Sequence, residues 1–316
     1  MSPSPAATTP RQLALTALLV TGGAVLSWAA LLVVSRVVLL RYQIDPWSYS
    51  FLQLAAGGAA LVAAGGLRQP DFTVFRRPST WALGVLRVLS AASFTAVVVW
   101  VNVLEASVLG SINVPLAALA VWALLGRRPT RGEWVGHLVL LLAVAWLLLG
   151  LEAEILRPVL TLMLFGEACL IGATLIAEKH PDNLSARPGA RLRLSGAVLL
   201  VTALLFLAIR GGSDGIAALA PTAWSWPLLT AGVLAGIGLR APALVLSFWS
   251  IRLIGGQNYL AAVAVMPLLG LGLEALAAAG GFIEVFRFSP AQLPPAFGVV
   301  LGSLLVVGAR LRAKRA

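Results

Sequence analysis

Charged residues are scarce in this sequence, and their scarcity excludes an ordinary soluble fold. Only 11% of the 316 residues are charged, whereas 59% are hydrophobic. Soluble domains carry roughly 25% charged residues. A helix needs about 20 apolar residues to cross a hydrocarbon core of about 30 Å, and this chain contains runs of that length repeatedly. The sequence therefore predicts an all-α, polytopic membrane protein.

Cysteine and histidine are also scarce, which removes several kinds of site. The single cysteine, Cys169, lies in an apolar run, so no intrachain disulfide can form. The two histidines, His137 and His180, show no metal-ligand spacing. A nucleophile elbow and a phosphate-binding glycine loop are absent as well. We therefore expect no metal, no cofactor and no enzymatic activity.

Apolar segments of spanning length occur ten times. We place the ten helices at residues 13–35, 47–66, 80–101, 107–126, 133–151, 158–177, 194–209, 225–250, 257–279 and 294–309. Residues 1–12 are rich in proline, serine and threonine, so a disordered tail is expected there. Residues 310–316 form a basic C-terminal tail.

The net charge of +11 reports membrane topology, because the basic residues lie mostly between the apolar runs. With the N-terminus inside, 16 of the 23 lysines and arginines lie in cytoplasmic segments, five lie outside, and two lie within spans. Basic loops remain in the cytoplasm. Both termini are therefore predicted to be cytoplasmic, in the inner (plasma) membrane of a bacterium, and no nucleic-acid partner is expected.

Two stretches of the chain share one arrangement. In each, an arginine lies early in one apolar run, and a proline lies inside the next run beyond a short polar break. Arg87 and Pro115 are the pair in the first stretch, and Arg240 and Pro267 are the pair in the second. Chance similarity between two hydrophobic helix pairs is the alternative to a duplication. The stretches are residues 86–125 and 239–276.

We interpret the chain as two five-helix repeats, residues 13–151 and 152–309. Because five is an odd number, the second repeat enters the membrane in the opposite orientation to the first. Inverted repeats of this kind frame a substrate site near the membrane midplane in many secondary transporters.

Four ionisable residues lie within the predicted spans. Charged groups there are costly and usually face the bundle interior or water. In one interpretation they form arginine–glutamate ion pairs that hold helices together. In the other, the arginines bind the anionic group of a solute, while a glutamate binds the solute or exchanges a proton. The four are Arg87, Glu167, Arg240 and Glu274.

Four further residues complete the candidate site. Trp28 is placed within the first span to face a cavity, and Asn113 is a polar residue two positions before Pro115. Pro115 and Pro267 each remove one backbone hydrogen bond and kink their helices. Such a kink frees a carbonyl that can face a cavity, although it can equally serve packing alone.

The segment from Ala106 to Gly150 resembles the end of a repeat of the drug/metabolite transporter superfamily, EamA type. A run of small residues precedes Pro115, and a basic loop from Arg127 to Thr130 leads into the fifth helix. The segment Ser27–Leu39 is similar to the first helix of the family, and Met266 with Pro267 repeats the proline pattern in the second half.

This resemblance implies a ten-helix, inverted-repeat carrier with a central cavity lined by helices one, three, four, six, eight and nine. The expected function is secondary active transport, as an exporter, of a small metabolite such as an amino acid or organic anion, by alternating access. The proton gradient or the gradient of the solute would supply the energy, because no nucleotide-binding motif is present. The alternative is an integral membrane enzyme or scaffold acting on lipid-linked substrates. Expected partners are the solute and the lipid bilayer, with monomer and homodimer both open.

Overall fold

The computed structural model describes residues 9–66, 72–98, 100–101, 103–187, 189–213, 215, 224–283 and 289–313. Within these residues, ten helical segments are long and apolar enough to cross a membrane, and no strand occurs. The predicted all-α, polytopic membrane fold is confirmed.

The helices follow one another along the chain with short connections. The first half contains α1 (Pro10–Tyr42), α2 (Pro46–Gly66), α3 (Thr73–Arg76), α4 (Pro78–Val98), α5 (Val103–Gly110), α6 (Asn113–Leu125) and α7 (Arg131–Leu149). The second half contains α8 (Ala153–Lys179), α9 (Pro181–Leu184), α10 (Ala190–Ser213), α11 (Trp226–Ala235), η3 (Gly236–Arg240), α12 (Ala241–Ile254), α13 (Gly256–Val263), α14 (Met266–Ala279), η4 (Pro290–Gln292) and α15 (Leu293–Ala313).

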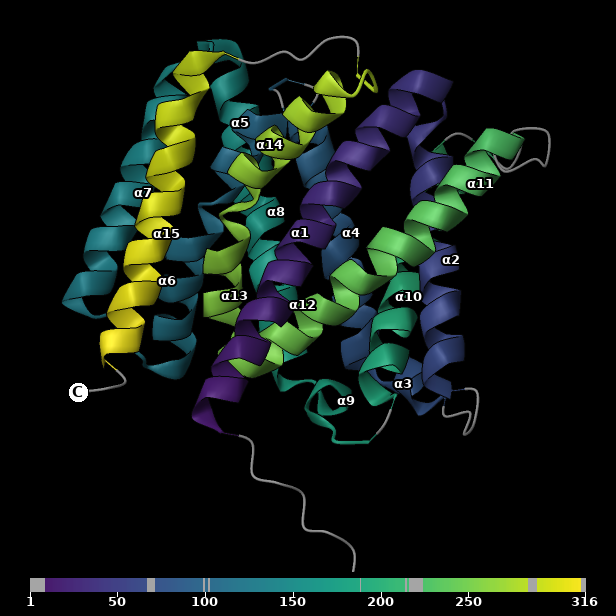
Figure 1. Ribbon diagram of the computed structural model, residues 1–316, viewed down its shortest axis with the longest axis horizontal. Coiled ribbons are helices and arrows are strands. Elements are labelled where there is room, and N and C mark those ends of the chain that lie inside the picture. The colour runs from purple at the N-terminus through teal and green to yellow at the C-terminus, as the bar shows by residue number, and fades with distance from the viewer. Residues whose placement is uncertain are drawn as a thin grey trace, which may run out of the picture.

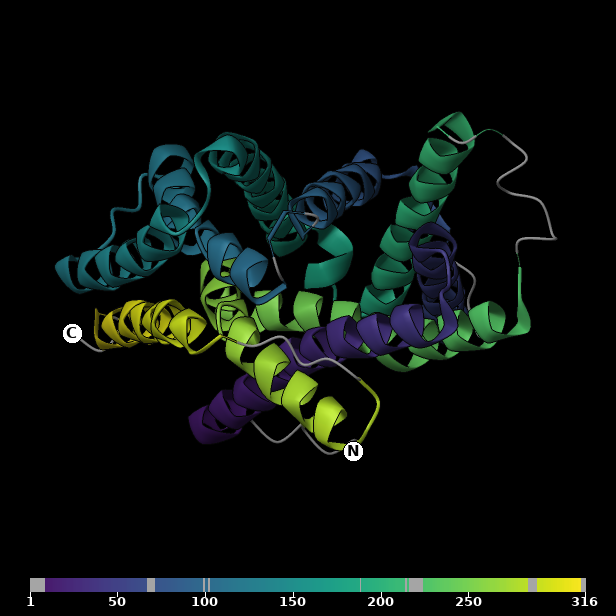
Figure 2. The ribbon, with the colours of Figure 1, turned by 90° about the horizontal axis from the view of Figure 1, so that it is seen from above.

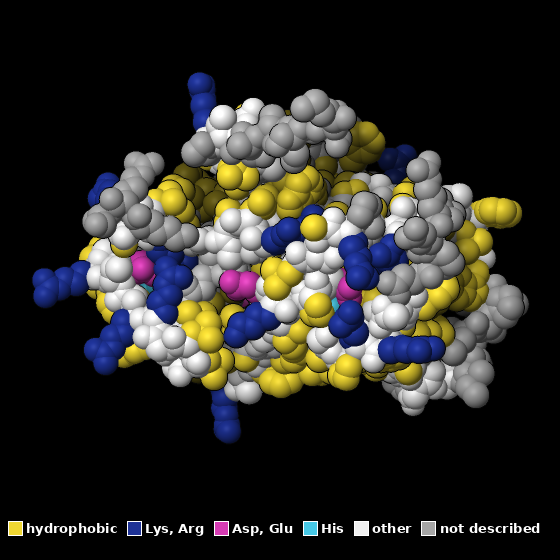
Figure 3. All heavy atoms as spheres, turned by 90° about the horizontal axis from the view of Figure 1, so that it is seen from below, with side chains coloured by type: hydrophobic (Ala, Val, Ile, Leu, Met, Phe, Trp, Pro, Cys, Tyr) yellow, Lys and Arg dark blue, Asp and Glu magenta, His cyan; other side chains and the backbone are white. Residues whose placement is uncertain are grey.

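Both described ends of the chain lie at the same end of the helix bundle (Figure 1). We call this end the terminus face, and the other end, where α1 finishes and α2 begins, the opposite face. Lysine and arginine side chains are spread across the terminus face, and acidic side chains are few (Figure 3).

The first helix is longer at both ends than the expected range 13–35. Thr9 starts it with a capping box, in which its side chain accepts from the backbone N–H of Gln12 and the Gln12 side chain accepts from the N–H of Thr9. The helix then continues to Tyr42. Arg36 and Arg41, expected in an outer loop, therefore lie in the last turns of α1. Residues 1–8 of the expected tail and residues 314–316 lie outside the described part of the chain.

The fourth and ninth spans are each broken near the middle. The helix is interrupted at Ser111 and Ile112, just before Pro115, and at Ala264 and Val265, just before Pro267. Proline cannot donate to the preceding turn, and its ring clashes with that turn. Each of these two spans therefore consists of two shorter helices, α5 with α6 and α13 with α14.

Close helix pairs hold the bundle together. The helix α2 packs along α10, and α7 packs along α15 (Figures 1 and 2). A Cβ atom on Gly58 would lie 2.9 Å from the carbonyl oxygen of Gly196, and one on Gly136 would lie 2.7 Å from that of Gly302. Small residues permit this approach where the lipid supplies no hydrophobic force between helices.

Candidate functional site

Two arginines from opposite halves of the chain meet at one tryptophan. The guanidinium carbons of Arg87 and Arg240 each lie 5.4 Å from the centre of the Trp28 ring. A cation over an aromatic face is attracted by the ring quadrupole. Arg87 lies near the middle of α4, and Arg240 lies near the middle of the span formed by α11, η3 and α12. We call these three residues, with the hydroxyl groups described below, the arginine cluster.

Arg240 lies at the end of a local change in helix geometry. The five residues Gly236–Arg240 form a π-helical turn, and the N–H of Ala241 donates to the carbonyl of Gly236. Pro242 follows at once and has no N–H to donate to the preceding turn. Such π turns occur often at functional sites.

Hydroxyl groups from α12 and α13 hold the Trp28 ring in place. The indole N–H of Trp28 donates to Ser247 Oγ at 2.9 Å, and the Tyr259 hydroxyl donates to the same oxygen at 2.7 Å. Ser247 in turn donates to the carbonyl of Ala243 at 2.6 Å. Ser247 and Tyr259 are both buried. Tyr259 was not among the site residues predicted from the sequence, although it lies in the first turns of the ninth span, directly after the polar break.

Neither arginine of the cluster has an ion-pair or hydrogen-bond partner among the described residues. The Nε atom of Arg240 is buried without a partner, and so is the hydroxyl of Tyr49, which lies near Arg240. The expected alternative, in which Arg87 and Arg240 pair with Glu167 or Glu274, does not occur in this part of the chain. The cluster therefore contains two cations that no described acidic group neutralises.

Glu167 and Asn113 form a second polar pair. The side-chain amide of Asn113 donates to Glu167 Oε2 at 3.0 Å, and both residues are buried. Asn113 begins α6, directly after the break in the fourth span. A Cβ atom on Gly110 would lie 3.1 Å from Glu167 Oε1, so α5 also packs closely against this carboxyl group. No hydrogen bond or ion pair of the described residues connects this pair to the arginine cluster.

Glu274 lies apart from both groups. It forms an ion pair with Arg36 at 2.8 Å, joining α14 to the last turns of α1 toward the opposite face. The structure thus brings Trp28, Arg87 and Arg240 together, and Asn113 with Glu167, but it gives Glu274 a different partner.

Two hollows in the described part of the chain lie away from these residues. One, of about 670 Å³, lies between α1 and α11 and is bordered by apolar side chains such as Val34, Trp226 and Leu239. The other, of about 350 Å³, lies near the terminus face and is bordered by residues such as Val121 and His180. Neither is lined by the arginine cluster or by Glu167.

Comparison with known protein families gives a match over the first half of the chain. Residues 15–149 match the model of the EamA-like transporter family. These residues are an EamA-like transporter domain. No curated protein matches the chain. A solved structure described only as "Crystal structure of protein" is 18% identical, with a TM-score of 0.64, and the match covers 93% of this chain and 99% of that one. At this identity the match shows the fold alone.

The EamA-like domain coincides with the first five spans and contains Trp28, Arg87 and Asn113. Arg240, Ser247, Tyr259 and Glu167 come from the residues that follow it. The resemblance to the drug/metabolite transporter superfamily is therefore confirmed for the first half, and the chain is an integral membrane protein that contains an EamA-like domain. Its candidate site is built from both halves.

Proposed function

We propose that this protein is a secondary active transporter that carries a small organic anion by alternating access. The observation that supports this function is the arginine cluster, with two unneutralised cations at mid-span. Each uncompensated arginine at the centre of a span costs roughly 2.5–3.5 kcal/mol on insertion scales. An apolar residue would insert more readily, so a bound anion that compensates both arginines explains why they are there.

The chemistry of the cluster favours carboxylate or phosphate groups on the solute. The planar guanidinium can hold either group through two parallel hydrogen bonds while remaining charged. The buried Tyr49 hydroxyl and Arg240 Nε supply further donors that lack partners. A solute with two negative charges would neutralise both arginines. A zwitterionic amino acid would need its ammonium group matched elsewhere, for example at Glu167.

Glu167 supports a proton as the coupling ion. Its carboxyl group is buried and hydrogen-bonded only to the neutral amide of Asn113 among the described residues. A carboxyl group without a neighbouring cation can bind and release a proton as access alternates. In this proposal the protein exports its solute from a bacterial cell across the inner membrane, and no organic cofactor or metal takes part.

Alternation between two access states requires two bodies that move against each other. We propose that residues 13–151 and 152–309 are inverted repeats. The matching breaks in the fourth and ninth spans support this duplication, and so does the position of Arg87 and Arg240 in equivalent spans. The basic residues on the terminus face support a cytoplasmic location for both termini.

One observation favours the second candidate, a protein that acts on lipid-linked substrates. The hollow of about 670 Å³ between α1 and α11 is bordered by apolar side chains and could receive an acyl or prenyl chain from the bilayer. A solute with such a chain would be a membrane lipid or its precursor, and a water-soluble dicarboxylate would not bind.

A thermal-shift screen of the purified protein separates the two functions. A ligand that binds only the folded state raises the apparent stability. We expect small dicarboxylates or phosphate monoesters to raise the melting temperature of the parent protein and to have no effect on Arg87→Gln with Arg240→Gln. Proteoliposome flux of the ligand that binds then tests transport. Stabilisation by lipid-linked ligands alone, unchanged in the double variant, would support the second candidate and contradict the first.

A further inference from the structure

The helix α13 is a short body between two interruptions of the chain. Before it, Gly255 adopts φ +83°, a left-handed conformation that favours glycine. After it, the break at Ala264 and Val265 separates it from α14. A helix of eight residues with a break at each end can change its position without moving either neighbour as a whole.

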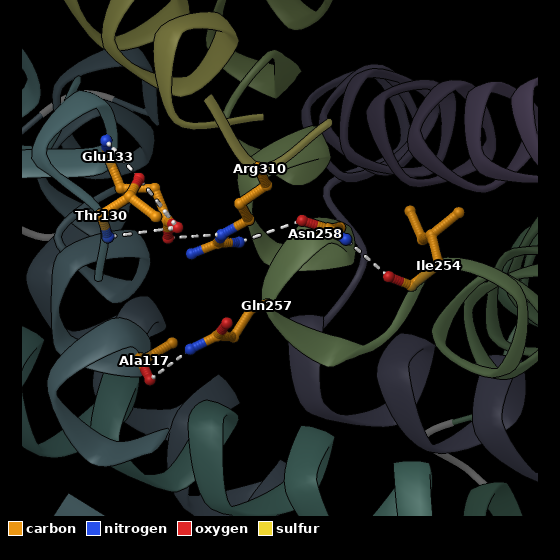
Figure 4. Close-up of polar contacts among 7 residues, drawn as sticks. All are labelled: Ala117, Thr130, Glu133, Ile254, Gln257, Asn258 and Arg310. Atoms are coloured by element: carbon orange, nitrogen blue, oxygen red, sulfur yellow. Dashed lines mark hydrogen bonds and ion pairs between the residues drawn. The ribbon is translucent and has the colours of Figure 1, made fainter. Parts of the chain in front are cut away.

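Three consecutive residues at the start of α13 attach it to three different helices. The N–H of Gly256 donates to Glu178 Oε2 on α8 at 3.0 Å. The side-chain amide of Gln257 donates to the carbonyl of Ala117 on α6 at 3.2 Å, and Asn258 Oδ1 accepts from Arg310 on α15 at 3.0 Å (Figure 4). We call residues 256–258 the latch. It lies near the terminus face, because α6, α8 and α15 all end there.

The attachment through Asn258 reaches a buried ion pair. Arg310 Nε donates to Glu133 Oε2 at 2.7 Å, and both side chains are almost fully buried. Figure 4 shows Arg310 between Glu133 and Asn258, with Thr130 beside the carboxylate. The ion pair joins α7 to α15, which already pack closely through glycines. Asn258 therefore holds α13 against a rigid helix pair.

The next residue after the latch belongs to the arginine cluster. Tyr259 donates to Ser247, the oxygen that also fixes Trp28, and it lies close to Arg87. Displacement of α13 would therefore break the latch and release the Tyr259–Ser247 hydrogen bond in the same movement. Four consecutive residues connect the terminus face to the candidate solute site.

We propose that α13 is the gate that closes the arginine cluster toward the terminus face, with residues 256–258 as its lock. This inference rests on the proposed function only in treating the cluster as the solute site. The state seen here is the one in which the gate is closed, and opening requires loss of the three latch contacts. The side-chain amides of Gln257 and Asn258 are suited to this role because their hydrogen bonds can be exchanged for bonds to water.

Accessibility of a cysteine beside the cluster tests the gate without any solute. The single native cysteine is replaced by Cys169→Ala, and Ser90→Cys, one turn from Arg87 on α4, becomes the reporter. A water-soluble maleimide is added to either side of reconstituted vesicles, and Arg312→Cys in a separate sample identifies the terminus face. Asn258→Ala and Gln257→Ala each remove one latch contact. We expect labelling from the terminus face to accelerate about tenfold for Asn258→Ala, whose lost bond is to a charged group, and about fivefold for Gln257→Ala.

Two further variants make the result specific. Asn183→Ala removes a buried amide that donates to the carbonyl of Ala177 at 2.9 Å near the same face but lies outside α13, so labelling should stay at the parent rate. Asn258→Asp keeps an oxygen that accepts from Arg310 but loses the amide that donates to the carbonyl of Ile254 at 2.7 Å, so labelling from the terminus face should stay closer to the parent rate than in Asn258→Ala. If only one of the latch variants Asn258→Ala and Gln257→Ala remains monodisperse after purification, the labelling rate of that variant decides the outcome.

A labelling rate equal to that of the parent in the folded latch variants would contradict the gate. An equal acceleration in Asn183→Ala would also contradict it, because that result would indicate general loosening of the helix bundle. Anion binding measured by thermal shift on the same preparations keeps the two proposals separate. Binding with unchanged labelling contradicts the gate alone, whereas the expected labelling with no anion binding contradicts the proposed function alone.

Discussion

Arg87 and Arg240 come from opposite halves of the chain and lie at the same distance, 5.4 Å, from one indole ring. Two like charges near one another in a membrane interior repel, and the Trp28 ring compensates only part of that cost. Cation–π contacts contribute about 0.5–1 kcal/mol at exposed sites and about 2 kcal/mol when desolvated. A bound anion can therefore compensate the part of this electrostatic cost that the Trp28 ring leaves uncompensated.

Replacing either arginine by lysine should weaken anion binding more than it weakens the fold. Lysine keeps the charge but loses the planar fork. We expect Arg87→Lys and Arg240→Lys to reduce affinity for the stabilising anion about tenfold, with the melting temperature of the ligand-free protein nearly unchanged. Isothermal titration beside thermal unfolding measures both quantities. Unchanged affinity with a clearly lowered melting temperature would show a structural role only.

Removing one charge should change the preference between solutes. In the parent, a dianion should bind more tightly than the matched monoanion because both arginines are neutralised. In Arg87→Gln or Arg240→Gln one cation remains, so the ratio of dianion to monoanion affinity should fall by about tenfold. Competition titration with a dicarboxylate and its half-amide measures this ratio. A constant ratio in both variants would contradict joint recognition by the two arginines.

Glu167→Gln should abolish coupling of transport to protons while leaving the fold intact. Glutamine can still accept the hydrogen bond from Asn113 through its carbonyl oxygen, but it cannot exchange a proton. Flux driven by a pH gradient across proteoliposomes should be lost, whereas exchange of labelled for unlabelled solute should persist. Asn113→Ala is the matched control, since it removes the hydrogen bond and leaves the carboxyl group. Full gradient-driven flux in Glu167→Gln would exclude this residue as the proton carrier.

The ion pair between Glu133 and Arg310 should matter to stability rather than to solute chemistry. Both side chains are buried, and breaking such a pair by removing one partner costs roughly 3–5 kcal/mol. Glu133→Gln should therefore lower the melting temperature strongly. The combined change Glu133→Leu with Arg310→Met should recover much of the loss, because no charge is left buried. Arg77→Gln, which removes a more exposed partner of Asp182, is the control and should change the unfolding free energy by under about 1 kcal/mol.

His180, which is buried near the terminus face, should make the stability of the protein depend on pH. Burial holds the pKa of His180 below its usual value of 6.5, with Asp182 partly offsetting this effect and Arg77 adding to it. Its Nδ1 accepts from the N–H of Asp182 at 3.2 Å, which requires an unprotonated nitrogen. The unfolded chain binds the proton more readily, so this stabilisation is present above pH 6.5 and is lost as the pH falls below it.

Melting temperatures of the parent and of His180→Asn, measured between pH 5.0 and 7.5, check this dependence. The asparagine oxygen can still accept from the N–H of Asp182 but does not titrate in this range. We expect the parent to lose more stability than the variant at the acidic end. Parallel curves for the two proteins would contradict a contribution from His180.

The sequence was sufficient for the number of apolar spans and for placing ionisable residues within them. It was weaker at helix ends, because the Thr9 capping box extends α1 and the polar residues Arg36 and Arg41 remain helical. It predicted kinks at Pro115 and Pro267 but not that each span would separate into two helices. It also left Tyr259 unnoticed, since a tyrosine beside a polar loop resembles an interfacial anchor.

Membrane insertion depends on the summed transfer free energy of each apolar segment, and that sum is local in the chain. The sequence by itself therefore determined the ten helices that, within the described residues, are long and apolar enough to cross a membrane. The rotation and crossing of helices that are distant in sequence decide which charged groups meet. Close helix contacts at glycines, such as Gly136 against Gly302, help to determine that rotation and crossing. Only the tertiary structure could decide that Glu274 pairs with Arg36, while Arg87 and Arg240 share Trp28 without an acidic partner in the described part of the chain.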